Sequence, residues 1–567
     1  MAGAADARRE PAPPRTDVGS TGGAPGLRPR QQRADRRGPW TGGWVADRLG
    51  VGLVTTGSPV GVTLPELVGL ALRRNPRRAH LLVSTVLGKH VPTDPRVVHA
   101  SAQLLGALAA ARIAGSGDDD ASTPAWTAAV DALAPALAGT PGAAATLRAR
   151  TDDLVADLRA RHASALTGTV VLGYAETATA LGHGVAETLG ARYLHSTRRS
   201  VPGVELAGGF EEQHSHATSH LLLPGDPGFL AGPGPLVLVD DELSTGQTIL
   251  NTIAALHERY PRGRYVVAAL VDVRSDADRA RLADLAERLG VRIDAVALVA
   301  GTIALGEDVL AEGRRLVEEH SPPDDAAPGA APGATGSVPA GSVAGPGTVD
   351  RLGALGWPAG VPDGARHGLT PELLDRLGAA ARDAASALAE QLTGAAPAAL
   401  AAPAAPATPV APATPAAPST AGPHAQRVLV LGTEELLHAP LLLAAHLADR
   451  LDAQGTSVAF SSTTRSPVLA LDAPDYAIRT RLVFPDHDAP DDGPGDRFAY
   501  NVAPGADPLR RFTDVVVVVD SAGETPALGS PAGLLARLAE HADRVHLVVL
   551  PSYRPPAGAP HPQETTP

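Results

Sequence analysis

Residues 235–248 read PLVLVDDELSTGQT, and this stretch decides the fold class of the chain. Its apolar run predicts a buried strand, its acidic pair ends that strand, and its Ser-Thr-Gly turn leads into a helix. Glycine lets a backbone approach a ligand closely, and the unpaired N–H groups at a helix N-terminus suit a phosphate. Two adjacent carboxylates repel phosphate, so they suit hydrogen bonds from ribose hydroxyls instead. The residues of this candidate site are Asp240, Asp241, Ser244, Thr245, Gly246, Gln247 and Thr248.

A simpler interpretation is a strand-to-helix turn in which Asp241 and Ser244 only cap the helix. That interpretation explains one acid and one hydroxyl. It leaves the second acid and the Thr-Gly pair without a role, although both follow the strand in the order that a ligand site needs. We therefore interpret the stretch as a binding site for a phosphorylated sugar.

The segments around this stretch alternate between strand-like and helical patterns. Amphipathic runs of helical length separate strand-like runs at 166–173, 234–240, 264–272 and 291–301. Such alternation predicts an α/β fold with a parallel sheet that helices cover on both faces. Ligands of such sheets bind at the carboxyl ends of the strands, so the loops leaving those ends are the candidate site.

Composition excludes several classes of protein. The chain has no Cys, so it forms no disulfides and has no thiolate metal site or Cys nucleophile. The net charge of −13 gives no strong signal for nucleic-acid binding. We find neither an apolar run long enough to span a membrane nor a secretory signal at the N-terminus. A cytoplasmic, multidomain protein without a membrane partner is therefore expected.

Runs rich in Pro, Gly and Ala divide the chain into packed segments and linkers, because such runs bury too little apolar surface to fold. One packed segment, TPELLDRLGAAARDAASALAEQL, begins with Thr370 as a helix cap and Pro371 in the first turn. The expected organisation is a disordered tail (1–39), a first α/β domain (40–320), a flexible linker (321–349), a helical connector (350–395), an Ala/Pro linker (396–424), a second α/β domain (425–555) and a tail (556–567).

Two further clusters carry charge or metal-ligating groups. Lys89 is the only lysine of the chain and follows an Arg-rich stretch, 73–78, so it is a candidate anion contact; a solvated basic face explains it equally well. His214, His216 and His220 have a spacing that can ligate zinc, although no fourth ligand is evident. Substrate contacts and ordinary surface histidines remain the alternatives for these three.

The run VLVDDELSTGQT resembles the phosphoribosyl pyrophosphate signature of type I phosphoribosyltransferases: four apolar residues, two acids, two variable positions and Thr-Gly-x-Thr. The resemblance implies that the acids hold the ribose hydroxyls and that the Ser-Thr-Gly loop binds the 5′-phosphate. It implies that the loop of Gly173, Tyr174, Ala175 and Glu176 binds pyrophosphate through backbone amides. Glu176 itself is a poor phosphate ligand, so it is expected to hold the loop or a magnesium-bound water.

Two arginines, Arg198 and Arg199, follow the strand after this loop and are placed to clamp pyrophosphate. The catalytic candidates are Asp240, Asp241 and Arg198. The substrate-binding candidates are Ser244, Thr245, Gly246, Gln247, Thr248, Gly173, Tyr174, Ala175, Glu176, Arg199 and Lys89. Mg²⁺ is expected mainly through the substrate, with Asp240 and Asp241 as candidate protein ligands.

A faint internal repeat links the two α/β segments. RVLVLGTEELL (427–437) echoes TVVLGYAETA (169–178) and places Glu435 beside Glu176. VAFSSTTRSP (458–467) echoes RYLHSTRRS (192–200), and TDVVVVVDSAGE (513–524) echoes the phosphate-loop strand but keeps one acid, Asp520. All α/β units share some of this pattern, but three echoes in the same order favour a degenerate second copy.

The whole arrangement resembles phosphoribosyltransferases of gene clusters associated with tellurium resistance and stress response. These join an orotate-transferase-like domain to a C-terminal domain named for a Thr-Arg-Ser-Pro signature, here residues 464–467. The resemblance covers roughly 40–320 and 425–550. It implies an enzyme that uses phosphoribosyl pyrophosphate and Mg²⁺ to transfer ribose 5-phosphate to or from a nitrogen of a base-like acceptor, with a homodimer as a candidate state. The alternative is a non-catalytic sensor of nucleotide or phosphoribosyl pyrophosphate.

Overall fold

The computed structural model describes residues 40–73, 78–116, 120, 122–201, 204–211, 219–321, 347–394, 426–488 and 495–552. The expected tails (1–39 and 556–567), the expected Ala/Pro linker (396–424) and residues 322–346 of the expected flexible linker lie outside this part of the chain. The described helices and strands belong to one compact unit, which runs from Pro39 onward.

The first sheet joins the segments that the sequence predicts as alternating strands. Its order is β1-β10-β9-β8-β4-β5, and every neighbouring pair is parallel except β1 with β10. Strand β4 and the apolar parts of β8 and β9 are buried because helices cover both faces, whereas the acidic residues of β8 are only partly buried. The strands are β1 (Gly52–Gly57), β4 (Val170–Gly173), β5 (Arg192–His195), β8 (Leu236–Leu243), β9 (Arg264–Asp272) and β10 (Arg292–Ala304).

The prediction that β8 ends at its acidic pair is wrong by two residues. The ladder with β9 continues beyond Asp241 through Glu242 and Leu243, which pair with Val271 and Asp272. Acidic side chains do not break a ladder, because backbone groups make it and the side chains project alternately from the sheet. The acids therefore lie on a strand rather than on a loop.

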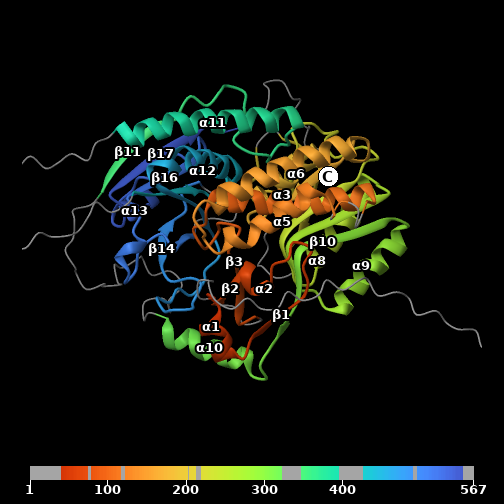
Figure 1. Cartoon of the computed structure of the whole chain (residues 1–567), viewed down its shortest axis with the longest axis horizontal. Helices are drawn as coiled ribbons and strands as arrows, with labels where there is room; N and C mark the ends of the chain where they lie inside the picture. The colour runs from red at the N-terminus through yellow and green to blue at the C-terminus, as the bar shows by residue number, and fades with distance from the viewer. Residues whose placement is uncertain are drawn as a thin grey trace, which may run out of the picture. The chain divides into compact units, whose positions relative to one another are not determined.

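Most helices of this first part pack on the sheet or on one another. Helix α3 is the central one and contacts α6, α7 and the strands β9 and β10 (Figure 1). It is long and apolar enough to cross a membrane, but 83% of its most apolar stretch is buried, as in a core helix, so it is weak evidence for a span. The helices are α1 (Gly43–Leu49), α2 (Leu64–Leu67), α3 (Pro95–Ala114), α5 (Pro124–Leu137), α6 (Ala143–Leu166), α7 (Thr179–Leu189), α8 (Gln247–Arg259), α9 (Asp276–Leu289) and α10 (Val309–His320).

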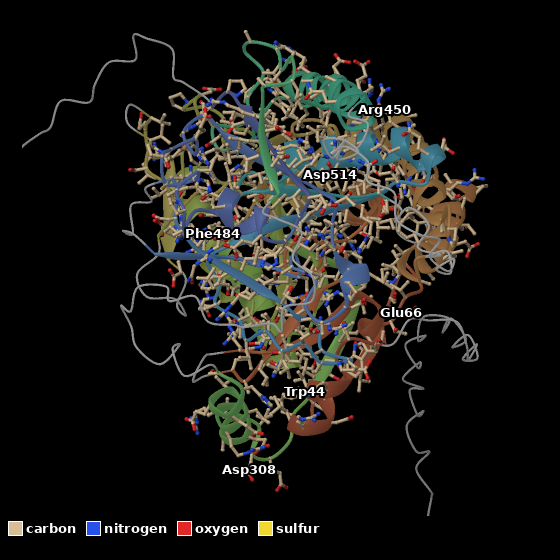
Figure 2. The ribbon with its side chains drawn as sticks, turned by 90° about the vertical axis from the view of Figure 1, so that its left-hand side faces the viewer. Trp44, Glu66, Asp308, Arg450, Phe484 and Asp514 are labelled. Atoms are coloured by element: carbon tan, nitrogen blue, oxygen red, sulfur yellow. The ribbon has the colours of Figure 1, made fainter. Side chains whose placement is uncertain are left out.

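Two hairpins lie outside the sheets. The hairpin of β2 (Val68–Leu72) and β3 (His80–Ser84) is antiparallel, as is that of β6 (Gly208–Glu211) and β7 (Ser219–Leu222). Trp44, labelled in Figure 2, ties α1 to neighbouring elements through edge-on ring contacts with His320 at 5.5 Å and Tyr476 at 5.4 Å. Residues far apart in sequence therefore share one apolar core.

The second sheet has the order β11-β17-β16-β12-β13-β15-β14. Its strands from β11 to β13 pair in parallel, and β15 and β14 add an antiparallel edge. The strands are β11 (Thr348–Gly353), β12 (Arg427–Gly432), β13 (Ser457–Thr464), β14 (Arg481–Pro485), β15 (Asp496–Tyr500), β16 (Asp514–Asp520) and β17 (Arg544–Leu550). Its helices are α11 (Pro371–Gly394), α12 (His438–Leu451) and α13 (Leu534–Ala539).

The segment expected as a helical connector, 350–395, instead belongs with the second sheet. Its first residues lie on β11, which pairs with β17, and its helix α11 packs along α12 (Figure 1). The apolar face of α11, buried from Leu374 to Leu392, explains the difference, because such a face needs a packing partner and a connector has none.

The second sheet repeats the topology of the first. The strands β9-β8-β4-β5 of the first sheet and β17-β16-β12-β13 of the second follow the same spatial order, the same chain order and the same parallel direction. Gly173 ends β4 and pairs with His195, and Gly432 ends β12 and pairs with Ser462. The predicted second copy is therefore present at the level of topology and register.

Candidate functional site

The Ser-Thr-Gly loop joins β8 to α8 at the carboxyl end of the first sheet. Gly246 precedes the helix with a φ of 72°, in the left-handed region that glycine adopts without strain. Helix α8 begins at Gln247. Its N-cap residue is Gly246, so no side chain caps the helix at that position. The amide of Gln247 lies 3.4 Å from the hydroxyl of Thr245. The loop therefore presents helix N–H groups and hydroxyls together, as the sequence predicts.

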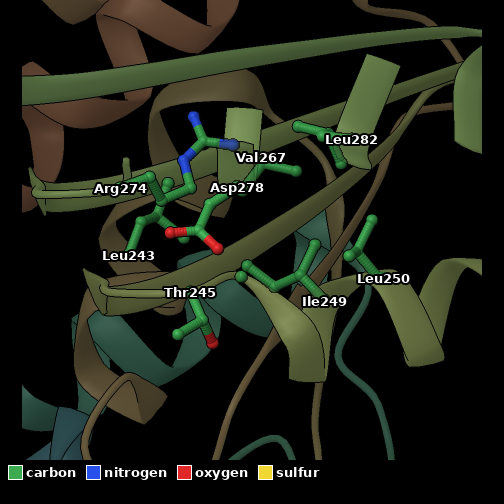
Figure 3. A pocket seen from close by; sticks show the side chains of 9 residues that line it. Leu243, Thr245, Ile249, Leu250, Val267, Arg274, Asp278 and Leu282 are labelled. Carbon is green, nitrogen blue, oxygen red and sulfur yellow. The ribbon is translucent and has the colours of Figure 1, made fainter. Parts of the chain in front are cut away.

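A small pocket lies behind this loop, between β8, α8 and α9 (Figure 3). Arg274 and Asp278 stand side by side in it, and the hydroxyl of Thr245 points away from both. Arg274 is engaged by Asp272, with contacts of 3.0 and 2.8 Å to its two carboxylate oxygens. This pocket supports the loop from its apolar side and holds no free cation for a phosphate.

The acidic residues of β8 have different interaction partners. Asp240 accepts a hydrogen bond from the amide of Asp241 at 2.9 Å. Glu242 pairs with Arg78 at 2.9 Å, and burial raises the pKa of its carboxyl despite this arginine. Asp241 and Glu242 also line a small cavity with Ser84 of the β2–β3 hairpin. The hairpin therefore lies against the acids, a contact that the sequence did not indicate.

The second candidate loop follows β4, the strand next to β8. The amide of Tyr174 donates to the carbonyl of Val239 at 3.1 Å, and the amide of Ala175 donates to the hydroxyl of Ser196 at 2.9 Å. The peptide bond between Ala175 and Glu176 is cis. Because β4 and β8 are neighbours, this loop and the phosphate loop leave the same edge of the sheet.

Lys89 reaches the same loop from a distant part of the sequence. Its Nζ donates to the hydroxyl of Thr177 at 2.5 Å. The solvated basic face that we weighed for Lys89 does not describe this half-buried position. The lysine therefore lies beside the loop that the sequence predicts for pyrophosphate.

Glu176 faces the second sheet rather than solvent. Its carboxylate accepts a hydrogen bond from Thr464 at 3.4 Å and pairs with Arg465 at 3.1 Å. Burial and the neighbouring Glu434 raise the pKa of Glu176, while Lys89 and Arg465 oppose that rise. These contacts join the loop at 173–176 to residues at the end of β13 in the second sheet.

Two family models match separate parts of the chain. Residues 67–302 match the model of a family described as phosphoribosyl transferase, and residues 363–538 match a model described as the TRSP domain C-terminal to it. The chain carries a phosphoribosyl transferase domain followed by a TRSP domain. The TRSP match includes Thr464 and Arg465, the residues that contact Glu176.

Several solved structures are similar to part of the chain. An adenine phosphoribosyl transferase from Trypanosoma brucei, in complex with AMP, pyrophosphate and ribose-5-phosphate, is 16% identical, with 27% of this chain and 66% of that chain covered and a TM-score of 0.20. The Giardia lamblia enzyme with 9-deazaadenine is 20% identical, with 27% and 80% covered and a TM-score of 0.19. No curated protein matches the chain. The fold assignment therefore rests on strand order and on the two domain matches.

The two arginines after β5 contact the TRSP domain. The backbone amide of Arg198 donates to Glu435 at 2.8 Å, and its guanidinium lies 3.5 Å from the ring of His220. Arg199 pairs with Asp488 and lies 3.8 Å from Asp520. Both arginines were expected at pyrophosphate. In this structure the side chain of Arg199 is engaged by acids of the TRSP domain.

Glu435 is the centre of these contacts. It accepts hydrogen bonds from Thr197 at 2.7 Å and from Arg366 at 3.2 Å. Burial opposes its ionisation, but Arg366 and other neighbouring cations outweigh burial and lower the pKa of Glu435 to about 2. The carboxylate is therefore charged and tied to both domains at neutral pH.

The charged residues around Glu435 form a cluster that we call the polar centre. Several of its residues were not identified from the sequence. Except for Glu434, which lies in the repeat segment at 427–437, they come from segments without a recognisable motif. The missed residues are Asp363, Arg366, Glu434, Asp488 and Arg497.

The zinc hypothesis finds no support among the described residues. His214 and His216 lie outside them, and His220 is buried, with its ring 2.9 Å from the hydroxyl of Ser196. Within the described ranges no group of three or more His, Asp or Glu side chains is arranged to hold a metal. His220 instead packs inside the domain beside the β5 end.

Asp363 gives the polar centre a measurable pH dependence. Burial, together with the neighbouring Asp520, raises the pKa of Asp363 to about 6, although Arg366 and Arg199 oppose the shift. The unfolded chain releases this proton near its ordinary pKa of 3.8, so the folded state loses relative stability as pH rises from about 4 to 6. We expect Asp363→Asn to gain stability over the wild type by up to about 3 kcal/mol across this range. Urea unfolding at pH 4, 5, 6 and 7 measures the difference, and a constant difference contradicts it.

Proposed function

We propose that this protein is a phosphoribosyltransferase that transfers ribose 5-phosphate between pyrophosphate and a nitrogen of a base-like acceptor, with phosphoribosyl pyrophosphate as donor. One observation carries the proposal. The neighbouring strands β8 and β4 bring the acidic pair, the Ser-Thr-Gly loop and the 174–177 loop to one edge of a parallel sheet. That edge is where ligands of such sheets bind.

The candidate residues divide the substrate between them. Asp240 and Asp241 accept hydrogen bonds from the ribose hydroxyls and favour the cation-like charge that develops at C1. Residues 244–248 bind the 5′-phosphate through hydroxyls and helix N–H groups. Residues 173–176 with Lys89 and Arg198 bind the pyrophosphate. Arg199 takes part only if it exchanges its acidic partners for the substrate.

Mg²⁺ fits this arrangement as an ion carried mainly by the substrate. Magnesium prefers oxygen ligands and keeps several waters, so one or two carboxylates with phosphate oxygens suffice. Asp240 and Asp241 supply such oxygens on adjacent positions of β8. When bound, the ion neutralises charge on the pyrophosphate leaving group. We also propose the cytoplasmic location and the stress- or tellurium-linked nucleotide metabolism that the sequence resemblance indicates.

A calorimetric titration tests the donor. We expect phosphoribosyl pyrophosphate to bind the full-length protein in the presence of Mg²⁺, and binding to weaken at least about tenfold when EDTA removes the ion, because the pyrophosphate charge is then unscreened. Ribose 5-phosphate with Mg²⁺ is the control for the phosphate loop alone. No heat of binding with folded protein contradicts the proposed donor.

A sensor without turnover is the second candidate function. The contact of Glu176 with Thr464 and Arg465 favours this function. A structural change at the 174–177 loop on ligand binding would be transmitted to the TRSP domain through this contact. Release of pyrophosphate in the presence of a panel of bases distinguishes the candidates. Tight binding without any pyrophosphate release supports the sensor.

A further inference from the structure

The phosphoribosyl transferase domain and the TRSP domain contact each other through pairs of equivalent residues. By strand register, Glu176 of the phosphoribosyl transferase domain corresponds to Glu435 of the TRSP domain, and Thr197 corresponds to Thr464. Glu435 accepts a hydrogen bond from Thr197, and Glu176 accepts one from Thr464. Each glutamate therefore binds the threonine of the other domain, as in a pair of subunits related by a twofold axis.

The local hydrogen bonds follow the same correspondence. In the first domain the amide of Ala175 donates to Ser196, and in the second the amide of Glu434 donates to the equivalent Thr463 at 3.1 Å. Likewise the amide of Arg199 donates to Thr197, and the amide of Ser466 donates to Thr464, both at 3.2 Å. The repeat is thus preserved at the strand ends, where these contacts lie.

The segments that precede the long helices α3 and α11 each pair with a strand of the other domain. Thr93 forms a bridge with Phe460 on β13 of the TRSP domain. Leu369, from the other repeat, forms a bridge with Tyr193 on β5 of the first domain. Phe460 and Tyr193 occupy equivalent positions by register, so each repeat covers a strand of the other. Lys89, which holds Thr177, lies four residues before Thr93.

From this exchange we infer that Arg465 of the TRSP domain is a positioning residue for the pyrophosphate loop of the first domain. The inference rests on the proposed function, because it concerns the same site. Arg465 touches no substrate in this assignment. It acts through Glu176, whose carboxylate it holds.

The geometry at Arg465 explains why its loss displaces the loop. Its Nε lies 3.1 Å from Glu176 and 2.8 Å from Glu434, so one N–H group joins carboxylates of both domains. Glu176 and Glu434 are both buried, and each disfavours the charge of the other. Without the shared cation, repulsion and the cost of an unpaired buried charge act on the loop that carries Glu176.

Amide hydrogen exchange on the ligand-free protein tests the positioning directly. We expect Arg465→Ala to speed exchange at least about tenfold for the amides of Ala175 and Ala178, which the loop geometry protects. Arg465→Lys, which keeps the charge, restores part of the protection. The control is Arg544→Ala, which removes an ion pair of 2.7 Å to Asp514 at the amino end of β16 (Figure 2) and leaves these amides unchanged.

Substrate binding and turnover supply the second measurement. We expect Arg465→Ala to lower kcat/KM for phosphoribosyl pyrophosphate on the order of 10- to 100-fold, since a loop displaced by about 1 Å costs this much. Most of the effect falls on the KM for this donor, and the KM for the acceptor stays the same. Arg465→Lys recovers part of it, and Arg544→Ala keeps the activity of the wild type. If Arg465→Ala does not fold, Thr464→Val replaces it in both measurements.

The outcomes separate the inference from the proposed function. If the wild type binds no phosphoribosyl pyrophosphate, the proposed function fails, and the exchange rates alone then decide whether Arg465 holds the loop. If Arg465→Ala leaves both the loop amides and donor binding unchanged, the inference is wrong while the proposed function stands. An equal loss of amide protection and of kcat/KM in Arg465→Ala and Arg544→Ala also overturns the inference, because that result indicates a general loss of stability.

Discussion

The double variant Asp240→Asn, Asp241→Asn is expected to lose about 10³-fold in turnover while remaining folded. Both carboxylates lie on β8 at the edge of the sheet where the phosphate loop begins. Asparagine keeps the size of each side chain but removes the negative charge that favours the cation-like transition state and attracts Mg²⁺. Pyrophosphate release under saturating donor and acceptor measures the loss.

The matched control for this variant is Asp152→Asn, Asp153→Asn. This pair is also adjacent in sequence but lies exposed on α6, away from the carboxyl ends of the strands. We expect it to keep wild-type activity. We expect both double variants to unfold within about 1 kcal/mol of the wild type, because none of the four acids is fully buried and asparagine keeps the size of each side chain. If the Asp240→Asn, Asp241→Asn variant keeps the turnover of the wild type, the assignment of the site to these acids is wrong.

The largest expected effect on stability is that of Glu434→Gln. Glu434 is buried and pairs with Arg465 at 2.8 Å and with Arg497 at 2.5 Å. Burial alone raises the pKa of a carboxyl, but these two arginines outweigh it and hold the pKa of Glu434 below its usual range. Gln removes the counter-charge of Arg497 and leaves Arg465 with Glu176 as its carboxylate partner, so we expect a loss of about 3 kcal/mol in the free energy of unfolding at pH 7.

Urea unfolding measures this loss, and the pH dependence checks its cause. A lowered folded pKa stabilises the protein above the ordinary pKa of 4.5, and the contribution falls as pH drops toward the folded value. The difference between Glu434→Gln and the wild type is therefore expected to narrow below about pH 4.5. The control is Glu242→Gln, whose carboxyl is only partly buried and has a raised pKa and one arginine ion-pair partner. It should cost less than about 1 kcal/mol, and equal costs contradict the argument.

The strand-turn-helix arrangement of residues 235–248 could be predicted from the sequence because all of its determinants are local, and its binding of a phosphate stays a prediction. A strand, two acids and a Gly-containing turn occupy 14 consecutive residues, 235–248, and the structure places them at one strand-to-helix junction. The loop at 173–176 was assigned from the family resemblance, and its part in binding pyrophosphate stays a prediction. The end of β8 was placed wrongly because its last two residues are held by pairing with Val271 and Asp272, which local sequence does not show.

The internal repeat was visible as three echoes, and the matching strand orders show why they occur in sequence order. The role of Glu176 was not visible. Its partners Thr464 and Arg465 lie 288 residues or more away, and only the tertiary structure brings them to the loop.

The sequence by itself determined the α/β class, the main alternating strands of the first sheet and the strand-turn-helix arrangement of residues 235–248, because periodicity and turn residues are properties of neighbouring residues. Only the tertiary structure decided that Arg199 meets Asp488, that the 350–395 segment joins the second sheet, and that Glu176 and Glu435 exchange partners across the domains. Such contacts depend on the orientation of two packed sheets. The physical reason is that a buried charge takes its partner from whatever element packs against it, and that element is set by the fold as a whole.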